Sequence, residues 1–233
     1  MPGTAVIAGF GPGFCEELAW TLAEEGHPVG LIARSQEYSE DVADRLREAG
    51  HEAIAIPADL TDPDRVEACF DRLRDAFGPI EVLAHTASTV TSGSDVELDP
   101  DRLERLWRLY AYAGLCCFRE ALADLRGTGG TALFFGAAPE AGDFAFKSGK
   151  GATRGLARSL ADEYHSEGIH VAHVVIDGML LNPDVYEGPG EVDEDDYIDP
   201  AAAARSCYQL IDQPDRARTF EIDLHARDPT TGR

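Results

Sequence analysis

Short apolar segments alternate with longer amphipathic segments along almost the whole chain of 233 residues. Segments such as TAVIA (4–8) and HVAHVVI (170–176) are rich in β-branched residues, which predicts strands. Segments such as FCEELAWTLAEEG (14–26) carry apolar residues at helical spacing. Because strict alternation of strand and helix gives parallel strands covered on both faces, the pattern predicts an α/β protein with a doubly wound sheet.

The alternation predicts seven strands and six helices. The strands are expected at residues 4–8, 28–33, 52–58, 81–87, 130–137, 170–176 and 218–224. The helices are expected at residues 14–26, 41–50, 62–78, 99–125, 143–167 and 201–211. Since no linker interrupts this order, we expect a single Rossmann-type domain over residues 1–225, with a seven-stranded parallel sheet, and a C-terminal tail over residues 226–233.

The charge of the chain excludes several classes of partner. The formal net charge is −23, from 43 acidic and 20 basic residues. Such a chain repels nucleic acids and anionic lipids, so neither is an expected partner. No apolar run is long enough to span a membrane, and the N-terminus lacks the basic start of a signal peptide. Five scattered cysteines without ligand spacing indicate reduced thiols and no metal site, which predicts a cytoplasmic protein.

Lysine is nearly absent. Only Lys147 and Lys150 are lysines among the 20 basic residues. This acidic, arginine-over-lysine composition is similar to that of cytosolic proteins of salt-accumulating halophiles, whose surface carboxylates hold water and hydrated cations. A lysine that persists against such a bias is a candidate for a role that arginine cannot fill.

Glycines after the first predicted strand form a candidate phosphate site. The segment AGFGPGF places Gly9, Gly11 and Gly13 between the strand at 4–8 and the helix at 14–26. Glycines there let backbone N–H groups and the helix N-terminus approach a pyrophosphate. The spacing also suits a tight turn that needs glycine for its backbone geometry, but its place in the first βα turn favours a dinucleotide site.

The end of the second predicted strand indicates which dinucleotide is bound. An NAD site usually has a carboxylate there for the ribose 2′-hydroxyl, whereas this chain has Ala33, Arg34 and Ser35. An arginine offers a planar set of donors to a 2′-phosphate. We therefore predict NADP(H) rather than NAD(H), against the alternative that Arg34 is a surface residue paired with nearby acids.

At this point the chain resembles the short-chain dehydrogenase/reductase family over nearly its whole length. AGFGPGF resembles the family's TGxxxGxG motif, with Ala8 for the threonine and Cys15 for the last glycine. ADLTD (58–62) is similar to the end of the family's third strand, and LAHTAS (83–88) stands where NNAG is expected. KGATRGLARSLADEYHSEGIHVAHVVIDG (150–178) resembles the helix and strand that follow the family's YxxxK motif.

The resemblance implies a set of cofactor contacts and an oligomer. Asp59 and Leu60 would flank adenine, and Lys150 would hold the nicotinamide ribose hydroxyls. The expected cofactor-binding residues are Gly9, Phe10, Gly11, Gly13, Phe14, Arg34, Ser35, Asp59, Leu60, Thr86, Ala87, Lys150 and Gly178. The family commonly pairs its two long helices, here 99–125 and 143–167, so the resemblance implies a homodimer or homotetramer.

The same resemblance implies that most of the catalytic set is missing. The family's proton-donating tyrosine precedes the lysine by four residues, and here that residue is Phe146. Gly136 or Ala137 stands at the serine position, and Ala111 at the asparagine position. Lys150 alone remains as the expected catalytic residue. The end of the chain further resembles a divergent subgroup that also has phenylalanine at the tyrosine position.

Other side chains are candidates for the missing chemistry. His85 ends the fourth predicted strand, near where substrates bind in open α/β sheets, and is either an acid or base or a structural histidine. Tyr110 and Tyr112 flank Ala111 and either reach the cleft or pack in the core or an oligomer interface. Lys147 is expected to be an ordinary surface residue.

Three functions fit the sequence. The first is an NADP(H)-dependent oxidoreductase with a rearranged proton donor and a small-molecule substrate. The second is an NADP(H)-binding protein without redox turnover, acting as a sensor or an inactive partner. The third is a non-redox enzyme that uses the same cleft. The first is favoured because the subgroup shares the phenylalanine. The acidic segment 185–200 is expected to be a solvated loop or a flap over the site.

Overall fold

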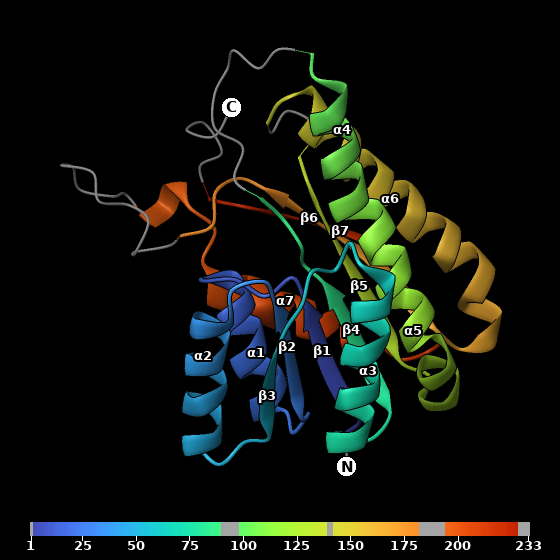
Figure 1. Ribbon diagram of the computed structural model, residues 1–233. Helices are drawn as coiled ribbons and strands as arrows, with labels where there is room; N and C mark the ends of the chain where they lie inside the picture. The colour runs from blue at the N-terminus through green and yellow to red at the C-terminus, as the bar shows by residue number, and fades with distance from the viewer. Residues whose placement is uncertain (1, 90–97, 139–141, 182–193, 228–233) are drawn as a thin grey trace.

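One parallel sheet of seven strands, in the order β3-β2-β1-β4-β5-β6-β7, forms the centre of the molecule (Figure 1). The structure is a computed structural model, and it describes residues 2–89, 98–138, 142–181 and 194–227. The strands are β1 (Thr4–Ala8), β2 (Val29–Ala33), β3 (Ala53–Pro57), β4 (Ile80–His85), β5 (Thr131–Ala137), β6 (His170–Asp177) and β7 (Glu221–His225). The predicted fold class is confirmed.

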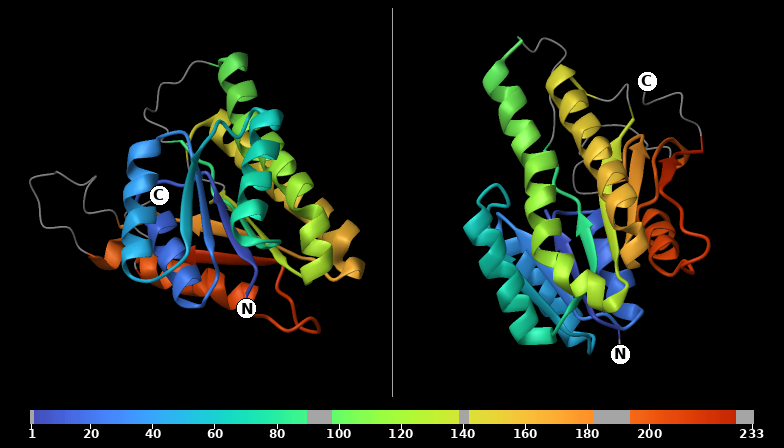
Figure 2. Two further views of the ribbon diagram at one scale, coloured as in Figure 1. Left: turned by 60° about the horizontal axis from the view of Figure 1, so that its bottom comes forward. Right: turned by 90° about the vertical axis from the view of Figure 1, so that its right-hand side faces the viewer.

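Helices cover both faces of the sheet (Figure 2). The α-helices are α1 (Phe14–Glu24), α2 (Gln36–Glu48), α3 (Pro63–Phe77), α4 (Pro100–Trp107), α5 (Ala113–Thr128), α6 (Phe144–Tyr164) and α7 (Pro200–Ile211). One apolar core joins α1, α2 and α7 to one face, and a second joins α3, α5 and α6 to the other. Strands β1 and β2 are buried on both faces, which is why their sequences are continuously apolar rather than alternating.

Aspartate followed by proline begins three of the helices. Asp62, Asp99 and Asp199 precede α3, α4 and α7. The carboxylates of Asp62 and Asp199 each accept two hydrogen bonds from backbone N–H groups of the first turn, and that of Asp99 accepts one. Proline fits the first helical position because its missing N–H has no partner there in any case. These caps determine the residue at which each helix begins.

The predicted start of the second helix is wrong. Helix α2 begins at Gln36 rather than at residue 41. Its first turn is polar, so hydrophobic periodicity gave no signal there. Ser39 is buried in that turn, and its hydroxyl donates to the backbone oxygens of Ser35 and Gln36 at 3.1 and 3.0 Å.

The single helix predicted over residues 99–125 is instead divided. A π-helical turn at Arg108–Tyr112 separates α4 from α5. Such a turn inserts a residue into the helical register and often lies at a functional site. Here it turns Tyr110 and Ala111 inward, and both are buried.

Most of the predicted acidic loop or flap at 185–200 lies outside the described residues. Its described end joins the edge of the cleft, because Leu181 N–H donates to Ile198 O and Ile198 N–H donates to Met179 O. None of the helices that the structure describes is long and apolar enough to cross a membrane.

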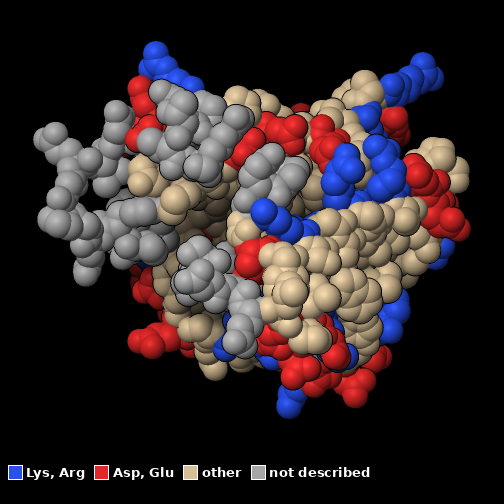
Figure 3. Space-filling model, turned by 90° about the horizontal axis from the view of Figure 1, so that it is seen from above, with Lys and Arg blue, Asp and Glu red and all other residues tan. Residues whose placement is uncertain are grey.

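The strand order creates a crevice where the strands end. Strand β1 pairs with β2 on one side and β4 on the other, so the connections after β1 and β4 leave in opposite directions. Viewed from this edge, the surface shows acidic side chains spread around the rim and a hollow among uncharged residues (Figure 3). The sheet topology therefore puts the glycine turn and the ends of β2 to β6 around one cleft.

Candidate functional site

The glycine turn after β1 approaches the end of β4 closely. Gly9 has a φ of 101°, and a Cβ added there would lie less than 3.0 Å from the Ala87 backbone. Only glycine therefore fits this position without moving a strand. Thr86 strengthens the contact, since its hydroxyl donates to Gly9 O at 3.1 Å. By contrast, a Cβ at Gly11 would meet no atom within 4 Å, so that part of the turn faces open space.

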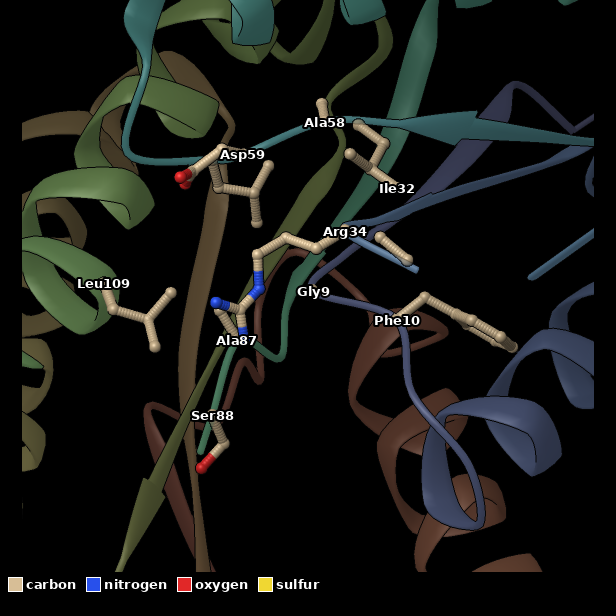
Figure 4. Close-up of a pocket in the computed structure, with 11 residues that line it drawn as sticks. Gly9, Phe10, Ile32, Arg34, Ala58, Asp59, Ala87, Ser88 and Leu109 are labelled. Carbon is tan, nitrogen blue, oxygen red and sulfur yellow. The ribbon is translucent and has the colours of Figure 1, made fainter. Parts of the chain in front are cut away.

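One pocket of the cleft lies between the ends of β1, β2, β3 and β4 (Figure 4). Arg34 extends from the end of β2 across this pocket toward Ala87, with Asp59 and Leu109 on the far side. Within the described part of the chain, Arg34 forms no ion pair. Asp59 accepts hydrogen bonds from the Thr61 N–H and hydroxyl at 2.9 and 2.8 Å, and these bonds hold its pKa below the usual value. The pocket thus presents an unpaired guanidinium to any ligand.

A second pocket, of about 350 Å³, continues from the first through Gly9 and Ser88, which line both. Its walls are mostly apolar, with a few polar groups near the glycine turn. The apolar lining includes Pro12, Phe14, Phe135, Phe146, Ile176 and Leu180. The polar side chains are those of Cys15, Thr86, Ser88 and Lys150. Together the two pockets form a continuous cleft with a basic end and an aromatic end.

Lys150 is the charged group at the aromatic end. Its side chain is 7% exposed, and Nζ donates to Phe135 O at 3.1 Å. Nζ also lies 4.4 Å from the centre of the Tyr110 ring and 5.8 Å from that of Phe146, which is cation–π geometry. Burial lowers the pKa of Lys150 to about 8. An ammonium of this pKa can lose a proton near neutral pH.

Phe146 lies one helical turn before Lys150 and lines the same pocket. Its ring meets Tyr110 edge to face, with ring centres 5.7 Å apart. Ala111 lies in the π-helical turn and does not line either pocket. Phe146 thus forms part of an apolar wall beside the ammonium, whereas Ala111 lies outside both pockets.

Gly136 and Ala137, the two residues that the resemblance puts at the serine position, differ in the space around them. Ala137 lines the second pocket, so a side chain there faces the cleft. A Cβ on Gly136 would instead lie less than 3.0 Å from Nε2 of His173. Gly136 therefore has no room for a serine while His173 occupies that space.

The structure does not support the acid or base role predicted for His85. Its side chain is 2% exposed and packs beneath α5, against Phe134 and Gly114, instead of lining either pocket. Burial lowers its pKa to about 3, so the ring is neutral. The residue reaches the C-terminal end of β4 as predicted, but its side chain faces the covering helix because alternate residues of a strand face opposite sides.

Tyr110 lies in the core rather than in the lining of the cleft. It is 1% exposed and fills the space over Gly149 between α6 and the π-helical turn. Its hydroxyl forms no hydrogen bond within the described residues. Burial raises the pKa of Tyr110. Tyr112 is half-buried under the guanidinium of Arg108.

The other expected cofactor residues are nearly all brought together. Gly9, Phe10, Arg34, Asp59, Leu60 and Ala87 line the first pocket, and Gly9, Gly11, Phe14, Thr86, Lys150 and Gly178 line the second. Gly13 and Ser35 line neither, because each directly precedes a helix, at α1 and α2 respectively. Sequence reasoning did not assign Ser88, Cys15, Leu109, Ile176 and Leu180 to the site, although Ser88 and Cys15 lie within motifs that it had singled out.

Comparisons with known proteins agree with this geometry. A family model described as short chain dehydrogenase matches residues 3–181. Cis-4-hydroxycyclohexanecarboxylate dehydrogenase of Sinomonas cyclohexanicum is 31% identical over 194 residues, which cover 81% of this chain and 77% of that protein. Versicolorin reductase stcU of Emericella nidulans is 29% identical and covers 90% of this chain and 83% of its own. The crystal structure of a short-chain dehydrogenase from Rhodopseudomonas palustris is 27% identical, with a TM-score of 0.78 and coverage of 96% and 98%.

Proposed function

The chain belongs to the short-chain dehydrogenase/reductase family of NAD(P)-dependent oxidoreductases, and from that premise we propose that it reduces a small apolar carbonyl compound with NADP(H) and with Lys150 as proton donor. One observation carries the proposal. Lys150 lines the second pocket together with Phe146, and its Nζ lies 5.8 Å from the centre of the Phe146 ring, which carries no hydroxyl.

The residues of the cleft from Arg34 to the glycine turn fit a phosphorylated dinucleotide. The open space at Gly11 suits a pyrophosphate, because backbone N–H groups of the turn and the N-terminus of α1 face it. The unpaired guanidinium of Arg34 suits a 2′-phosphate, and no carboxylate competes at residues 33–35. When bound, NADP(H) supplies the hydride.

Lys150 would supply the proton. Its Nζ would donate one proton to the carbonyl oxygen and become a neutral amine, while the hydride goes to the carbonyl carbon, so the carbonyl group becomes the CH–OH group of an alcohol. The hydrogen bond to Phe135 O and the Tyr110 ring hold Nζ in place. A donor is most effective when its pKa lies near the working pH, and burial brings the pKa of Lys150 to about 8.

The walls of the second pocket indicate the class of substrate. Three phenylalanines and two aliphatic side chains line a space of about 350 Å³. Such a site binds a compact apolar molecule and positions its carbonyl through few polar contacts. Two similar proteins, the hydroxycyclohexanecarboxylate dehydrogenase of Sinomonas cyclohexanicum and a trihydroxynaphthalene reductase of Pestalotiopsis fici, also bear names that refer to ring compounds. We therefore propose cyclic ketones, enones and quinones as the first compounds to test.

The experiment combines calorimetry with NADPH consumption. We expect NADPH to bind about ten to a hundred times more tightly than NADH, because one charge-assisted contact contributes about 1.5–3 kcal/mol. Arg34→Asp should remove this preference. Equal affinities for NADPH and NADH in the wild type would contradict the cofactor assignment.

Turnover is tested with a matched pair of variants. Lys150→Met should abolish consumption of NADPH, whereas Tyr110→Phe keeps the aromatic ring under the ammonium and should retain it. If Tyr110→Phe instead abolishes turnover, the tyrosine hydroxyl is the donor. If the wild type binds NADPH but consumes none with the whole panel, the alternative of a binding protein without turnover holds.

We also propose that the protein assembles with copies of itself through α4, α5 and α6. Helix α4 contacts α6, and Trp107 at the end of α4 and Leu115 in α5 are 47% and 44% exposed. Large exposed apolar side chains favour an interface. Light scattering should report a homodimer or homotetramer, and Trp107→Glu with Leu115→Glu should shift it toward the monomer.

A further inference from the structure

A groove separate from the two pockets of the cleft also reaches Lys150. It has a volume of about 550 Å³ and lies between α6 and the strands β6 and β7. Lys150 and Ala137 line both this groove and the aromatic end of the cleft. Lys147, the other lysine of the chain, is exposed as predicted and also lines the groove. The buried ammonium thus has one side toward the proposed substrate and another toward a separate opening.

A histidine and a carboxylate form a pair in this groove. His173 is 2% exposed, and its Nδ1 lies 2.9 Å from Oε2 of Glu221. Arg154 donates two hydrogen bonds to Glu221, at 2.6 and 2.7 Å, and holds the pKa of that carboxyl at about 2. Glu221 is therefore ionised, so Nδ1 of the neutral ring carries the hydrogen and donates it. Nε2 is left with a free lone pair.

That lone pair has no hydrogen-bond partner among the described residues. A buried acceptor without a partner is costly unless it serves a purpose. Nε2 abuts Gly136, and Nζ of Lys150 bonds to the preceding carbonyl, Phe135 O. Nε2 of His173, on β6, and Nζ of Lys150, on α6, therefore both lie beside the peptide group that joins Phe135 to Gly136.

We propose that His173, held by Glu221, exchanges protons with Lys150 and so reprotonates it from the groove after each reduction. The proposal rests on the proposed function, in which Lys150 donates the proton. Nε2 is closed to solvent in the described structure, so the exchange requires a water molecule from the groove to enter between the His173 ring and Nζ. Nε2 takes a proton from that water and passes it to the neutral Nζ, and the hydroxide returns to the groove. Nζ becomes the ammonium again, and the imidazole returns to its neutral form with Nδ1 still bonded to Glu221.

Charges around His173 explain why this exchange follows the chemistry. Burial lowers the pKa of His173, Glu221 on β7 raises it, and Arg154 and Lys150 on α6 lower it. Asp177 on the same strand and Asp223 on β7 also line the groove. When Lys150 loses its charge, one source of repulsion disappears, so His173 takes up a proton more readily at the moment when Lys150 needs one.

The first test measures the coupling without cofactor or substrate. The chain holds seven histidines, so NMR of protein labelled at histidine ¹³Cε1 can follow His173 through a pH titration. Lys150→Met should raise the pKa of His173 by about one unit. Lys147→Met removes a charge from the exposed part of the same groove and should leave it nearly unchanged. An identical His173 titration in the wild type and in Lys150→Met overturns the proposal.

The second test separates a proton-transfer role from a packing role. His173→Ala should lower kcat for NADPH consumption at least about tenfold with little change in KM, and imidazole in solution should restore it saturably. His170→Ala is the matched control, because His170 is a buried histidine of β6 that bonds to Thr219 O and does not line the groove. That variant should not respond to imidazole.

The outcomes distinguish the two proposals. Wild-type protein that never consumes NADPH overturns the proposed function, while the titration still decides whether His173 and Lys150 are coupled. Full activity of His173→Ala, or a loss that imidazole does not restore, overturns the exchange. If His173→Ala fails to fold, His173→Gln keeps most of the volume and should show the same loss of kcat, and retained activity in that variant overturns the exchange equally.

Discussion

The two ends of the cleft differ in what holds them together. The end beside Arg34 is built by backbone contacts, in which Gly9 touches Ala87 and Thr86 bonds to Gly9 O. The end beside Lys150 is built by side chains, chiefly those of Phe135, Phe146 and Lys150 itself. Backbone contacts are part of the fold, so they persist if the fold persists. Side-chain chemistry can change while the sheet stays intact, which is why recognition of a cofactor says little about the reaction.

The largest expected effect is a loss of stability when the backbone contact at the Arg34 end of the cleft is disturbed. Gly9→Ala puts a Cβ less than 3.0 Å from the Ala87 backbone at a φ of 101°, so either a strand moves or the turn distorts. We expect a loss of about 3 kcal/mol or more in the free energy of unfolding, measured in urea. Gly11→Ala is the matched control, because its Cβ would meet open space. It should keep stability and weaken NADPH binding. Equal stability of the two variants would contradict the described contact.

Placing a serine at position 136, at the Lys150 end of the cleft, should cause the next largest loss of stability. Gly136→Ser drives its Cβ into the His173 ring, and overpacking of this kind costs about 1–3 kcal/mol. Thermal unfolding should show this loss, and His173→Ala in the same chain should recover it. Ala137→Ser faces the cleft and should be tolerated. A stable Gly136→Ser single variant would mean that His173 can leave its place at little cost.

Acid should destabilise the protein through His85. Its pKa is about 3 in the folded protein, below the ordinary value of 6.5, so the unfolded chain binds the extra proton first. Stability is therefore complete above pH 6.5 and falls as the pH decreases, by about 2 kcal/mol at pH 5. His85→Leu should flatten this part of the profile, whereas the exposed His165→Leu should not. An unchanged profile in His85→Leu would show that the ring is not buried as described.

The smallest effect expected is a gain in activity. Phe146→Tyr adds a hydroxyl at the aromatic end, where the Lys150 ammonium lies 5.8 Å from the ring centre. A nearby cation favours the phenolate, so this tyrosine would be a better acid than an ordinary one. With Ala137→Ser in the same chain, we expect about a tenfold rise in NADPH-dependent reduction of reactive carbonyls. The single variant alone can be silent because the family's residues act as a unit. No rise in the double variant would count against the placement of Phe146 beside the substrate.

The sequence was sufficient for the sheet, and most of the residues that it suggested for cofactor binding line the two pockets of the cleft. Continuous apolar strands such as β1 and the glycines after them carry local signals that survive in one sequence. The start of α2 was missed because its first turn is polar and its buried serine is satisfied by backbone oxygens. The π-helical turn was missed because it depends on the fit of Tyr110 over Gly149, which are far apart in the chain.

The close contact between Gly136 and His173 also could not be predicted from the sequence. Gly136 and His173 approach through the pairing of β5 with β6, and Glu221 arrives from β7. No single one of these residues carries a sequence signal, because the feature that matters is their contact in the folded sheet. His85 shows the opposite case, since its place at the end of β4 was foreseen while its direction depended on which face of the strand it occupies.

The shared space of Gly136 and His173 also constrains the evolutionary history open to this chain. A lineage that acquired the histidine could gain a serine at position 136 by one mutation only with a loss of about 1–3 kcal/mol in stability, because that variant would carry both side chains where only one fits well. Return would need two changes, and the first would either destabilise the protein or leave a cavity. Reversion is therefore obstructed by packing alone, so descendants of such an ancestor would diversify around the histidine instead of recovering the older arrangement.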